Sequence, residues 1–489
     1  MMKVLLVQCP LYDVEMPPLG IAYLVASLKS KKIPVEVLDI NIDFFHNNQQ
    51  YHKFWMPENY AYCMPLNFFL GPEELDKIFD NYAKKILETK AGIIGFSVQT
   101  TSNHFSIGIS AKIKAIDPSR IIIFGGPECS REIVFGYWLL MPGKGDYMVL
   151  GEGEEILPEF VERISQGKAV TECRGLVMKE GERIFDTGKR EGIVDLDKLP
   201  SADFSLFKLD RYLHKEALPV ITSRGCLRKC VFCFDTGHQG VYRHRSSEKI
   251  VEEIYYLYHN YSLRRLKFND LLINGDLKLL EDICDNLIPL RLNDLYWSGN
   301  MITREGMSSA FFRKMYRAGC RSLTFGLETA SPYILKRMGK YYPLKKLKEM
   351  IKTVTLRGIQ VETNWIVGFP GETRRDLFNT MKFIANNRRY IHSTSAANCL
   401  EILRGSILFR NIGKFNIEFT SDNTWRCDEH DEAERVYRKR LFNDFLLQMG
   451  TLIRTQSTYN QYRKKEVGFF ETKKNLTSFR KQLNLPWFL

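Results

Sequence analysis

Short Val- and Ile-rich runs alternate with helical patterns along the first 165 residues, and this alternation constrains the fold more than any other feature of the chain. Strands that are apolar along their whole length are typical of a parallel sheet covered by helices on both faces. The pattern predicts an α/β fold that begins with a doubly wound, flavodoxin-like (Rossmann-type) domain over residues 1–170. The expected strands are Val4–Val7, Val35–Leu38, Ile93–Phe96, Ile121–Phe124 and Tyr147–Leu150, and the expected helices are Ile21–Leu28, Leu75–Leu87, Phe105–Ile113 and Ile156–Ile164.

Glycines and small polar residues follow these strands, at the edge where ligands bind in such sheets. Glycines let a large cofactor approach the backbone, and Ser, Thr and Gln supply hydrogen bonds. Taken singly, each segment is also an ordinary turn. Taken together and in order, the segments resemble the cobalamin-binding domain of a large class of radical SAM enzymes. The resemblance implies that cobalamin binds at Pro18, Leu19, Gly20, Ser97, Thr100, Gly125, Gly126, Gly151, Gly153 and Glu154.

The loop after the first strand departs from one form of that domain. The methionine-synthase type carries Asp-x-His-x-x-Gly there, and its His binds cobalt, whereas Leu11–Met16 of this chain contain no His. The resemblance is therefore to the subset that binds cobalamin without a protein His ligand, and we expect no lower axial His. His104, after another strand, is the alternative candidate. An aromatic-rich insertion, Phe44–Phe69, is expected either to shield the corrin or to cap the sheet.

Three cysteines, Cys226, Cys230 and Cys233, have the spacing C-x3-C-x2-C directly after the apolar run 218–221. The whole chain has 11 cysteines, an odd number spread over its length, so a disulfide framework is not expected. Three thiolates on one short loop can bind three irons of a cubane cluster and leave the fourth iron open for chemistry. The competing interpretation is a structural zinc site, in which His238 would supply the fourth ligand.

The cysteine spacing, with Phe232 before the last cysteine, resembles the radical SAM signature. The resemblance implies a [4Fe-4S] cluster on the three cysteines, S-adenosyl-L-methionine (SAM) bound to the open iron, and a partial (βα)6 barrel of the TIM type over residues 214–421. The further strands are expected at Leu266–Asn269, Leu295–Ser298, Ser322–Leu327, Val361–Val367 and Thr394–Leu403. The helices are expected at Ser247–Tyr261, Lys278–Ile288, Met307–Ala318, Pro332–Met338, Leu344–Leu356 and Arg374–Asn386.

Residues at the ends of these strands continue the resemblance. In the family, such positions line the SAM pocket, with polar or acidic groups near the ribose and the methionine amine and with glycines beside the adenine. Each also has a local alternative, because Gly368–Thr373 can be a loop with a helix N-cap and Glu328 can cap a turn. The positions that the resemblance assigns to SAM are Phe232, Asn269, Asp270, Arg304, Gly326, Glu328, Gly368, Pro370 and Gly371.

The segment between the two domains, residues 171–213, contains an expected hairpin and a polar linker. The hairpin pairs Leu176–Met178 with Arg183–Phe185, and the linker is Leu199–Asp203. Two short strands and a Pro-bearing connector indicate docking between domains rather than a third core.

The last segment, residues 422–489, is expected to be a small basic helical region that covers the barrel mouth or determines substrate specificity. From Asp431 to Leu489 there are 12 Lys and Arg but six Asp and Glu. Basic runs such as Arg438–Arg440 and Arg463–Lys465 are expected to be solvated helix faces rather than an RNA site.

The net charge of the chain, +13, permits a nucleic-acid or anionic-membrane partner without requiring one, and a nucleic-acid partner is not expected. No run of about eighteen apolar residues is present, and the first residues lack the features of a signal peptide. The sequence therefore predicts a soluble, cytoplasmic protein with no membrane span.

The two resemblances together imply a cobalamin-dependent radical SAM enzyme. Such an enzyme would cleave SAM reductively to a 5′-deoxyadenosyl radical and transfer a methyl group from methylcobalamin to a carbon of a small-molecule or peptide substrate, with a flavodoxin or ferredoxin as reductant. Cyclisation or rearrangement without methyl transfer is the first alternative. A tRNA methylthiotransferase, with Cys9, Cys63 and Cys129 on a second cluster, and a non-catalytic corrinoid-binding protein are further alternatives. The motifs identify neither the substrate nor a catalytic residue.

Overall fold

Five parallel strands form the centre of the first sheet, and all five lie where the sequence predicts them. The computed structural model describes residues 1–55, 70–130, 143–180, 183–235, 239–395, 397–421 and 424–451. The strands run in the order β2-β1-β3-β4-β5, which is the flavodoxin-like order with its switch point between β1 and β3. Their bounds are β1 (Val4–Gln8), β2 (Val35–Asp39), β3 (Ile93–Ser97), β4 (Ile121–Gly125) and β5 (Tyr147–Val149).

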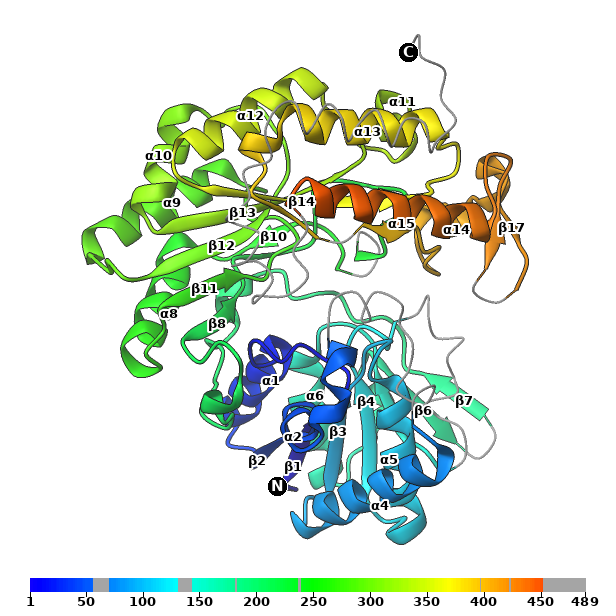
Figure 1. Ribbon diagram of the computed structural model, residues 1–489. Helices are drawn as coiled ribbons and strands as arrows, with labels where there is room; N and C mark the ends of the chain where they lie inside the picture. Colours follow the sequence, from blue (N-terminus) through cyan, green and yellow to red (C-terminus); the bar gives the residue numbers. More distant parts are fainter. Residues whose placement is uncertain are drawn as a thin grey trace. The chain divides into compact units, whose positions relative to one another are not determined.

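Helices cover both faces of this sheet, which explains why the inner strands β1, β3 and β4 are apolar and largely buried (Figure 1). On one face α1 (Leu19–Ser30) packs against α6 (Gly153–Ser165), and on the other α4 (Pro72–Glu88) packs against α5 (Asn103–Ile116). The sheet face below α4 and α5 forms a large apolar core with their buried side chains.

The first part of the aromatic insertion joins that core. It forms α2 (Ile40–Asn47) and the 3₁₀ helix η1 (Gln49–Trp55), and Phe44 and Phe54 are buried in the same cluster. These residues therefore cap the sheet, which is one of the two roles expected for the insertion. Residues 56–69 of the insertion lie outside the described residues.

The predicted hairpin is β6 (Leu176–Glu180) with β7 (Arg183–Asp186), and it extends the first sheet by antiparallel pairing of β6 with β5. The connector after it is held to α1, because Asp203 N donates to Ala22 O at 3.1 Å and the Lys29 ammonium lies 2.7 Å from the Asp203 carboxylate. The first compact unit of the chain is Met1–Val220. The hairpin and the connector thus pack as parts of that unit. This part of the chain also contains three short 3₁₀ turns, η4 (Val170–Glu172), η5 (Leu196–Lys198) and η6 (Leu209–Arg211).

A second sheet runs in the order β8-β11-β12-β13-β14-β15, and its pairs from β11 to β15 are parallel. It is the expected partial barrel, and the division between the two compact units falls at the end of its first strand. A small antiparallel pair, β9 (Ser223–Arg224) with β10 (Arg243–His244), follows β8. The strands of the sheet are β8 (Ala217–Val220), β11 (Arg265–Phe268), β12 (Tyr296–Met301), β13 (Cys320–Glu328), β14 (Gln360–Val367) and β15 (Ser393–Thr394).

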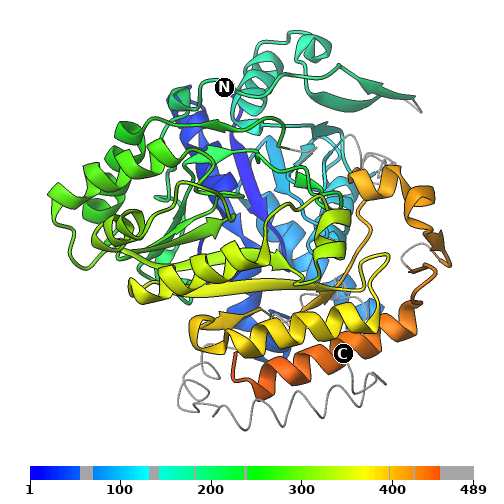
Figure 2. The same cartoon turned by 90° about the horizontal axis from the view of Figure 1, so that it is seen from above.

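The helices between these strands form the outer layer of the second unit (Figures 1 and 2). Several begin at a side chain that accepts from the first turn, as for Ser331 before Pro332 and for Thr373 in its capping box with Asp376. The helices are α8 (Ser247–Asn260), α9 (Leu277–Leu287), α10 (Ser309–Arg317), α11 (Pro332–Arg337), α12 (Leu344–Leu356) and α13 (Arg374–Asn386), with 3₁₀ turns η7 (Ile288–Leu290) and η8 (Arg388–Tyr390).

The expected continuous strand Thr394–Leu403 is wrong. The chain pairs with β14 twice, first through β15 and then through β16 (Asn398–Cys399). Between them the Ala397 N–H donates to Asn443 Oδ1 at 2.9 Å, so a side chain replaces the neighbouring strand as its partner.

After β16 the second unit continues through α14 (Ile407–Arg410), η9 (Ile412–Phe415) and β17 (Glu418–Phe419), which pairs with β18 (Trp425–Arg426). The described part of the C-terminal region consists of β18 and α15 (Glu432–Gln448). Helix α15 runs beside α13 and contacts β14 and β16 (Figure 2). No helix in the described ranges is long and apolar enough to cross a membrane.

The basic run 438–440 is not the solvated face that the sequence predicts. Arg438 and Lys439 are buried, and Arg440 is exposed. The Arg438 guanidinium donates to Glu372 O at 2.6 Å and to Glu434 Oε1 at 2.8 Å, which accounts for its burial. The second basic run, Arg463–Lys465, lies outside the described residues.

Candidate functional site

The loop that carries the three cysteines follows β8 and β9 and is clamped by backbone hydrogen bonds. Val231 N donates to Met338 O at 3.0 Å, and Leu408 N donates to Val231 O at 2.7 Å. At the start of the loop Gly225 has φ +81°, and a Cβ there would lie 2.6 Å from Val241 O, so only glycine fits. The loop geometry is therefore set by distant segments of the second unit.

The three thiols are each half-buried and unpaired by disulfides. Burial raises the pKa of Cys226, and it raises the pKa of Cys230 to about 11, while the positive charge of Lys340 acts in the opposite direction on both thiols. Such a set of thiols becomes a good cluster ligand when iron replaces the protons.

Three thiolates on one short loop are the donor set that a [4Fe-4S] cluster takes from the protein, and they would leave one iron open. A structural zinc site would need a fourth ligand. His238, the fourth ligand in the zinc interpretation, lies outside the described residues.

Phe232 packs against the apolar cluster below the loop. This cluster includes Met338, Phe369, Leu408 and Trp425, which come from four separate segments of the second unit. Apolar packing of Phe232 therefore supports the loop, while the thiols belong to the neighbouring cysteines of the same loop.

Asp270, predicted beside SAM, is turned toward the root of the cysteine loop. Its carboxylate is buried and accepts from Thr222 N at 3.1 Å, Thr222 Oγ1 at 2.7 Å and Ser223 Oγ at 2.6 Å. Burial raises the pKa of Asp270 to about 6, although the hydrogen bonds to Ser223 and Thr222 oppose that shift. The neighbouring Asn269 is exposed at the strand end.

Arg304 joins two loops at the same edge of the sheet. Its guanidinium donates to Asn274 O and Gly275 O, both at 2.6 Å. Asn274 in turn donates to Ile302 O at 2.8 Å. The guanidinium thus holds the loops after β11 and β12 together.

Glu328 ends β13 with φ +62° and is ion-paired with Lys340 at 2.7 Å. The same ammonium donates to Gly326 O at 2.6 Å, and a Cβ on Gly326 would lie 2.6 Å from Glu328 Oε1. Tyr342 donates to Leu327 O at 2.7 Å. The sequence pattern points to Gly326 and Glu328 but not to Lys340, because no motif marks a lysine that reaches the strand from the segment after α11.

In the loop after β14, arginine side chains lie so close to two glycines that a larger residue would not fit at either position. Gly368 has φ +79°, and a Cβ there would lie 2.5 Å from Arg435 Cδ. Gly371 has φ +95°, and a Cβ there would lie 2.8 Å from Arg337 Nε, which also donates to Pro370 O at 3.1 Å. The glycine pattern predicted for SAM therefore also serves packing within the protein.

The residues predicted for cobalamin lie at the carboxyl ends of β1, β3, β4 and β5. Among the described residues, no atom lies within 4 Å of a Cβ built on Gly20 or on Gly151. Ser97 is partly exposed at the end of β3, and Pro18 and Leu19 are buried at the start of α1. The small glycine residues at this edge are of the kind that lets a ligand approach the backbone.

The remaining predicted residues shape the same edge. Thr100 donates to Glu128 Oε2 at 2.9 Å, and Gly125 ends β4. Gly126 has φ +99°, and a Cβ there would lie 2.7 Å from Val98 O. Gly153 and Glu154 form the first turn of α6, where backbone N–H groups point outward.

His104 lies in the first turn of α5. Its ring packs 5.8 Å from the ring of Phe79 on α4, and burial lowers its pKa. The imidazole is therefore part of the packing between these two helices.

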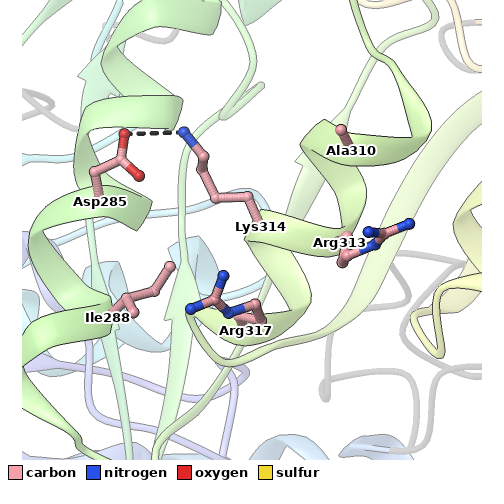
Figure 3. Close-up of a pocket in the computed structure, with 6 residues that line it drawn as sticks. All are labelled: Asp285, Ile288, Ala310, Arg313, Lys314 and Arg317. Atoms are coloured by element: carbon pink, nitrogen blue, oxygen red, sulfur yellow. Dashed lines mark hydrogen bonds and ion pairs between the residues drawn. The ribbon is translucent and has the colours of Figure 1, made fainter.

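One surface cavity lies away from all these residues (Figure 3). It has a volume of about 270 Å³ and lies between the C-terminal end of α9 and the length of α10, where Lys314 pairs with Asp285 at 2.9 Å. Both helices belong to the outer layer, and none of the predicted site residues lines the cavity. The cavity is therefore not part of the candidate site.

Comparison with known proteins agrees with this geometry. The Radical SAM superfamily model matches residues 220–384, from the end of β8 through most of α13. An uncharacterized methyltransferase of Pyrococcus horikoshii is 28% identical over 373 residues, which cover 75% of this chain and 72% of the relative. An anaerobic magnesium-protoporphyrin IX monomethyl ester cyclase of Synechocystis is 22% identical over 294 residues, which cover 59% of this chain and 58% of the cyclase.

A solved structure extends the likeness to both units. It is the radical S-adenosylmethionine methyltransferase TsrM from Kitasatospora setae with cobalamin and a [4Fe-4S] cluster bound. Its TM-score is 0.71 at 14% identity, over 99% of this chain and 100% of TsrM. The chain therefore contains a radical SAM domain and has the fold of the cobalamin-dependent radical SAM methyltransferases.

Proposed function

We propose that the chain is a cobalamin-dependent radical SAM enzyme that transfers a methyl group to an unactivated carbon of its substrate. The observation that carries this proposal is the clamped, half-buried loop with Cys226, Cys230 and Cys233 at the carboxyl end of the first barrel strand. The glycine-lined edge of the first sheet supports the second cofactor. When bound, the cluster with SAM supplies a 5′-deoxyadenosyl radical, and methylcobalamin supplies the methyl group.

The chain's own residues hold and shield these groups. The three cysteines would bind three irons, and the apolar cluster around Phe232 and Phe369 excludes water from one side of the loop. Lys340 and Glu328 form an ion pair near the cysteine loop. This pair would help to orient the methionine part of SAM. In the first unit, Gly20 and Gly151 would let the corrin approach the backbone.

The first test is metal content after anaerobic purification and reconstitution with iron, sulfide and hydroxocobalamin. We expect about four irons and about one cobalt per chain. Iron without cobalt would contradict the role proposed for the first unit. Zinc in place of iron would contradict the radical SAM assignment of the cysteines and favour a structural metal site.

The second test concerns methyl transfer. With a true substrate and a reductant such as flavodoxin or dithionite, methyl transfer yields S-adenosylhomocysteine, 5′-deoxyadenosine and a methylated product in proportion. We expect the substrate to be a small molecule or a peptide. Turnover that yields 5′-deoxyadenosine without S-adenosylhomocysteine would contradict methyl transfer.

Cyclisation or rearrangement is the second candidate function, because one of the relatives is a cyclase that aligns with 59% of this chain. In that case SAM cleavage and cobalamin binding remain, but the product carries no added methyl group. Mass spectrometry of the product separates the two functions by the mass of one methyl group.

A methylthiotransferase is disfavoured by the positions of two cysteines. Cys9 and Cys129 are fully buried in the apolar core of the first unit, and burial raises the pKa of Cys9 to about 12. Neither thiol is therefore placed to hold a second cluster. Cys63, the third cysteine of that hypothesis, lies outside the described residues.

A further inference from the structure

Lys340 places a positive charge beside the cysteine loop. The turn before it abuts the loop directly, because Val231 N donates to Met338 O at 3.0 Å and a Cβ on Gly339 would lie 3.1 Å from Lys229 O. The Lys340 ammonium lies 5.9 Å from the ring centroid of Phe232, the residue before Cys233. The side chain is 11% exposed, so water screens its charge only weakly.

The ammonium is fixed in this position by two acceptors. Glu328 Oε1 lies 2.7 Å and Gly326 O lies 2.6 Å from Nζ. The Lys340 ammonium is therefore held in place beside Phe232 of the cysteine loop by its two acceptors.

We propose that Lys340 raises the reduction potential of the [4Fe-4S] cluster bound by Cys226, Cys230 and Cys233. This inference rests on the proposed function, since it requires the cluster. Reduction adds one electron from an external reductant to the cluster and breaks no bond. A fixed positive charge nearby stabilises the reduced, more negative cluster more than the oxidised one. Lys340 thus acts through its fixed positive charge rather than by contact with substrate. The negative charge of the Glu328 carboxylate lowers the reduction potential.

The test is an anaerobic redox titration with dithionite, followed by electron paramagnetic resonance of the reconstituted protein without SAM. Lys340→Met is expected to lower the midpoint potential, and Lys340→Arg is expected to keep it near the wild-type value. Glu328→Gln is expected to raise it, because the opposing negative charge is removed. Lys336→Met is the matched control, since Lys336 is an exposed lysine on the neighbouring helix and the same charge change there should leave the potential unchanged.

The outcomes separate this inference from the proposed function. A wild-type chain that binds no cluster would overturn the proposed function and the inference with it. A wild-type cluster whose potential is the same in Lys340→Met and Glu328→Gln would overturn the inference alone, as would equal shifts in Lys340→Met and Lys336→Met. If Lys340→Met fails to hold a cluster, Glu328→Gln decides: an upward shift supports the inference, and no shift or a downward shift overturns it.

Discussion

The carboxylate of Asp270 accepts the hydroxyl hydrogen of Thr222 at 2.7 Å, and this contact joins the end of β11 to the root of the cysteine loop. Ser223 makes a second hydroxyl contact with the same oxygen at 2.6 Å. Both backbone N–H groups also donate to the carboxylate. A single buried side chain thus fixes the direction in which the chain leaves β8 toward Cys226.

Replacing Asp270 should loosen the cysteine loop. In Asp270→Asn one carboxylate oxygen becomes an NH₂ group, which faces donors and leaves buried hydrogen bonds unmade at a cost of about 1–3 kcal/mol. We expect lower thermal stability and faster loss of iron from the reconstituted protein. Iron content over time and the melting temperature measure both effects. Asp282→Asn, on the outer helix α9, is the control, and equal behaviour of the two variants would contradict this role of Asp270.

Each cluster cysteine should be required for iron binding. Cys226→Ala, Cys230→Ala and Cys233→Ala each leave two thiolates for a cubane, and we expect most of the iron and its visible absorbance to be lost. Cys427→Ala is the control, because Cys427 is also half-buried but lies in the β18–α15 segment. Full iron content in any of the three loop variants would contradict its role as a ligand.

Gly126 should be required for the shape of the cobalamin edge. In Gly126→Ala the strained φ of +99° and the approach of Val98 O to 2.7 Å act together, and such strain costs on the order of 1–3 kcal/mol. We expect reduced stability and weaker cobalamin binding, measured by calorimetry and by the absorbance of bound hydroxocobalamin. Gly143→Ala has a positive φ of +74°, and no described residue lies within 4 Å of its Cβ, so it serves as the control for the φ effect. Equal losses in both variants would show that the contact with Val98 has no part.

Local sequence patterns were sufficient for the fold and for the cysteine loop. The strands of the first sheet were predictable because burial on both faces demands apolar residues along the whole strand. The place of the cysteine loop after β8 was predictable from the apolar run before it, while the role of the three cysteines as cluster ligands stays a prediction. Neither signal depends on distant residues.

The surroundings of the loop depend on distant contacts and could not be predicted from local patterns. Asp270 was expected beside SAM, but its carboxylate points to Thr222, a partner 48 residues earlier in the chain. Lys340 reaches Glu328 from beyond α11, and Arg438 is buried because Glu372 and Glu434 surround it. A charged residue in a sequence is normally expected at the surface, and only the folded chain shows which partner compensates its charge.

His430 should make stability depend on pH. Its imidazole is 5% exposed and lies between Cys427, Arg435 and Phe369 O, and Arg438 and Glu429 also influence its charge. Burial lowers the pKa of His430 from 6.5 to about 4. Between pH 6.5 and about 4, the imidazole is therefore protonated in the unfolded chain but neutral in the folded chain. Because protonation favours the unfolded chain, the free energy of unfolding decreases by on the order of 3 kcal/mol as the pH falls from 6.5 through about 4.

The measurement is urea unfolding of the wild type and of His430→Gln across that pH range. Asp39 and Asp270 have pKa values raised to about 6, so their protonation stabilises the folded protein as the pH falls. The pH dependence of wild-type stability alone therefore combines opposite effects. The difference between the two proteins isolates the imidazole. We expect the wild type to lose stability relative to His430→Gln as the solution becomes more acidic. His259→Gln, at an exposed position on α8, should follow the wild type, and a pH-independent difference for His430→Gln would show that the buried imidazole protonates as easily as a free one.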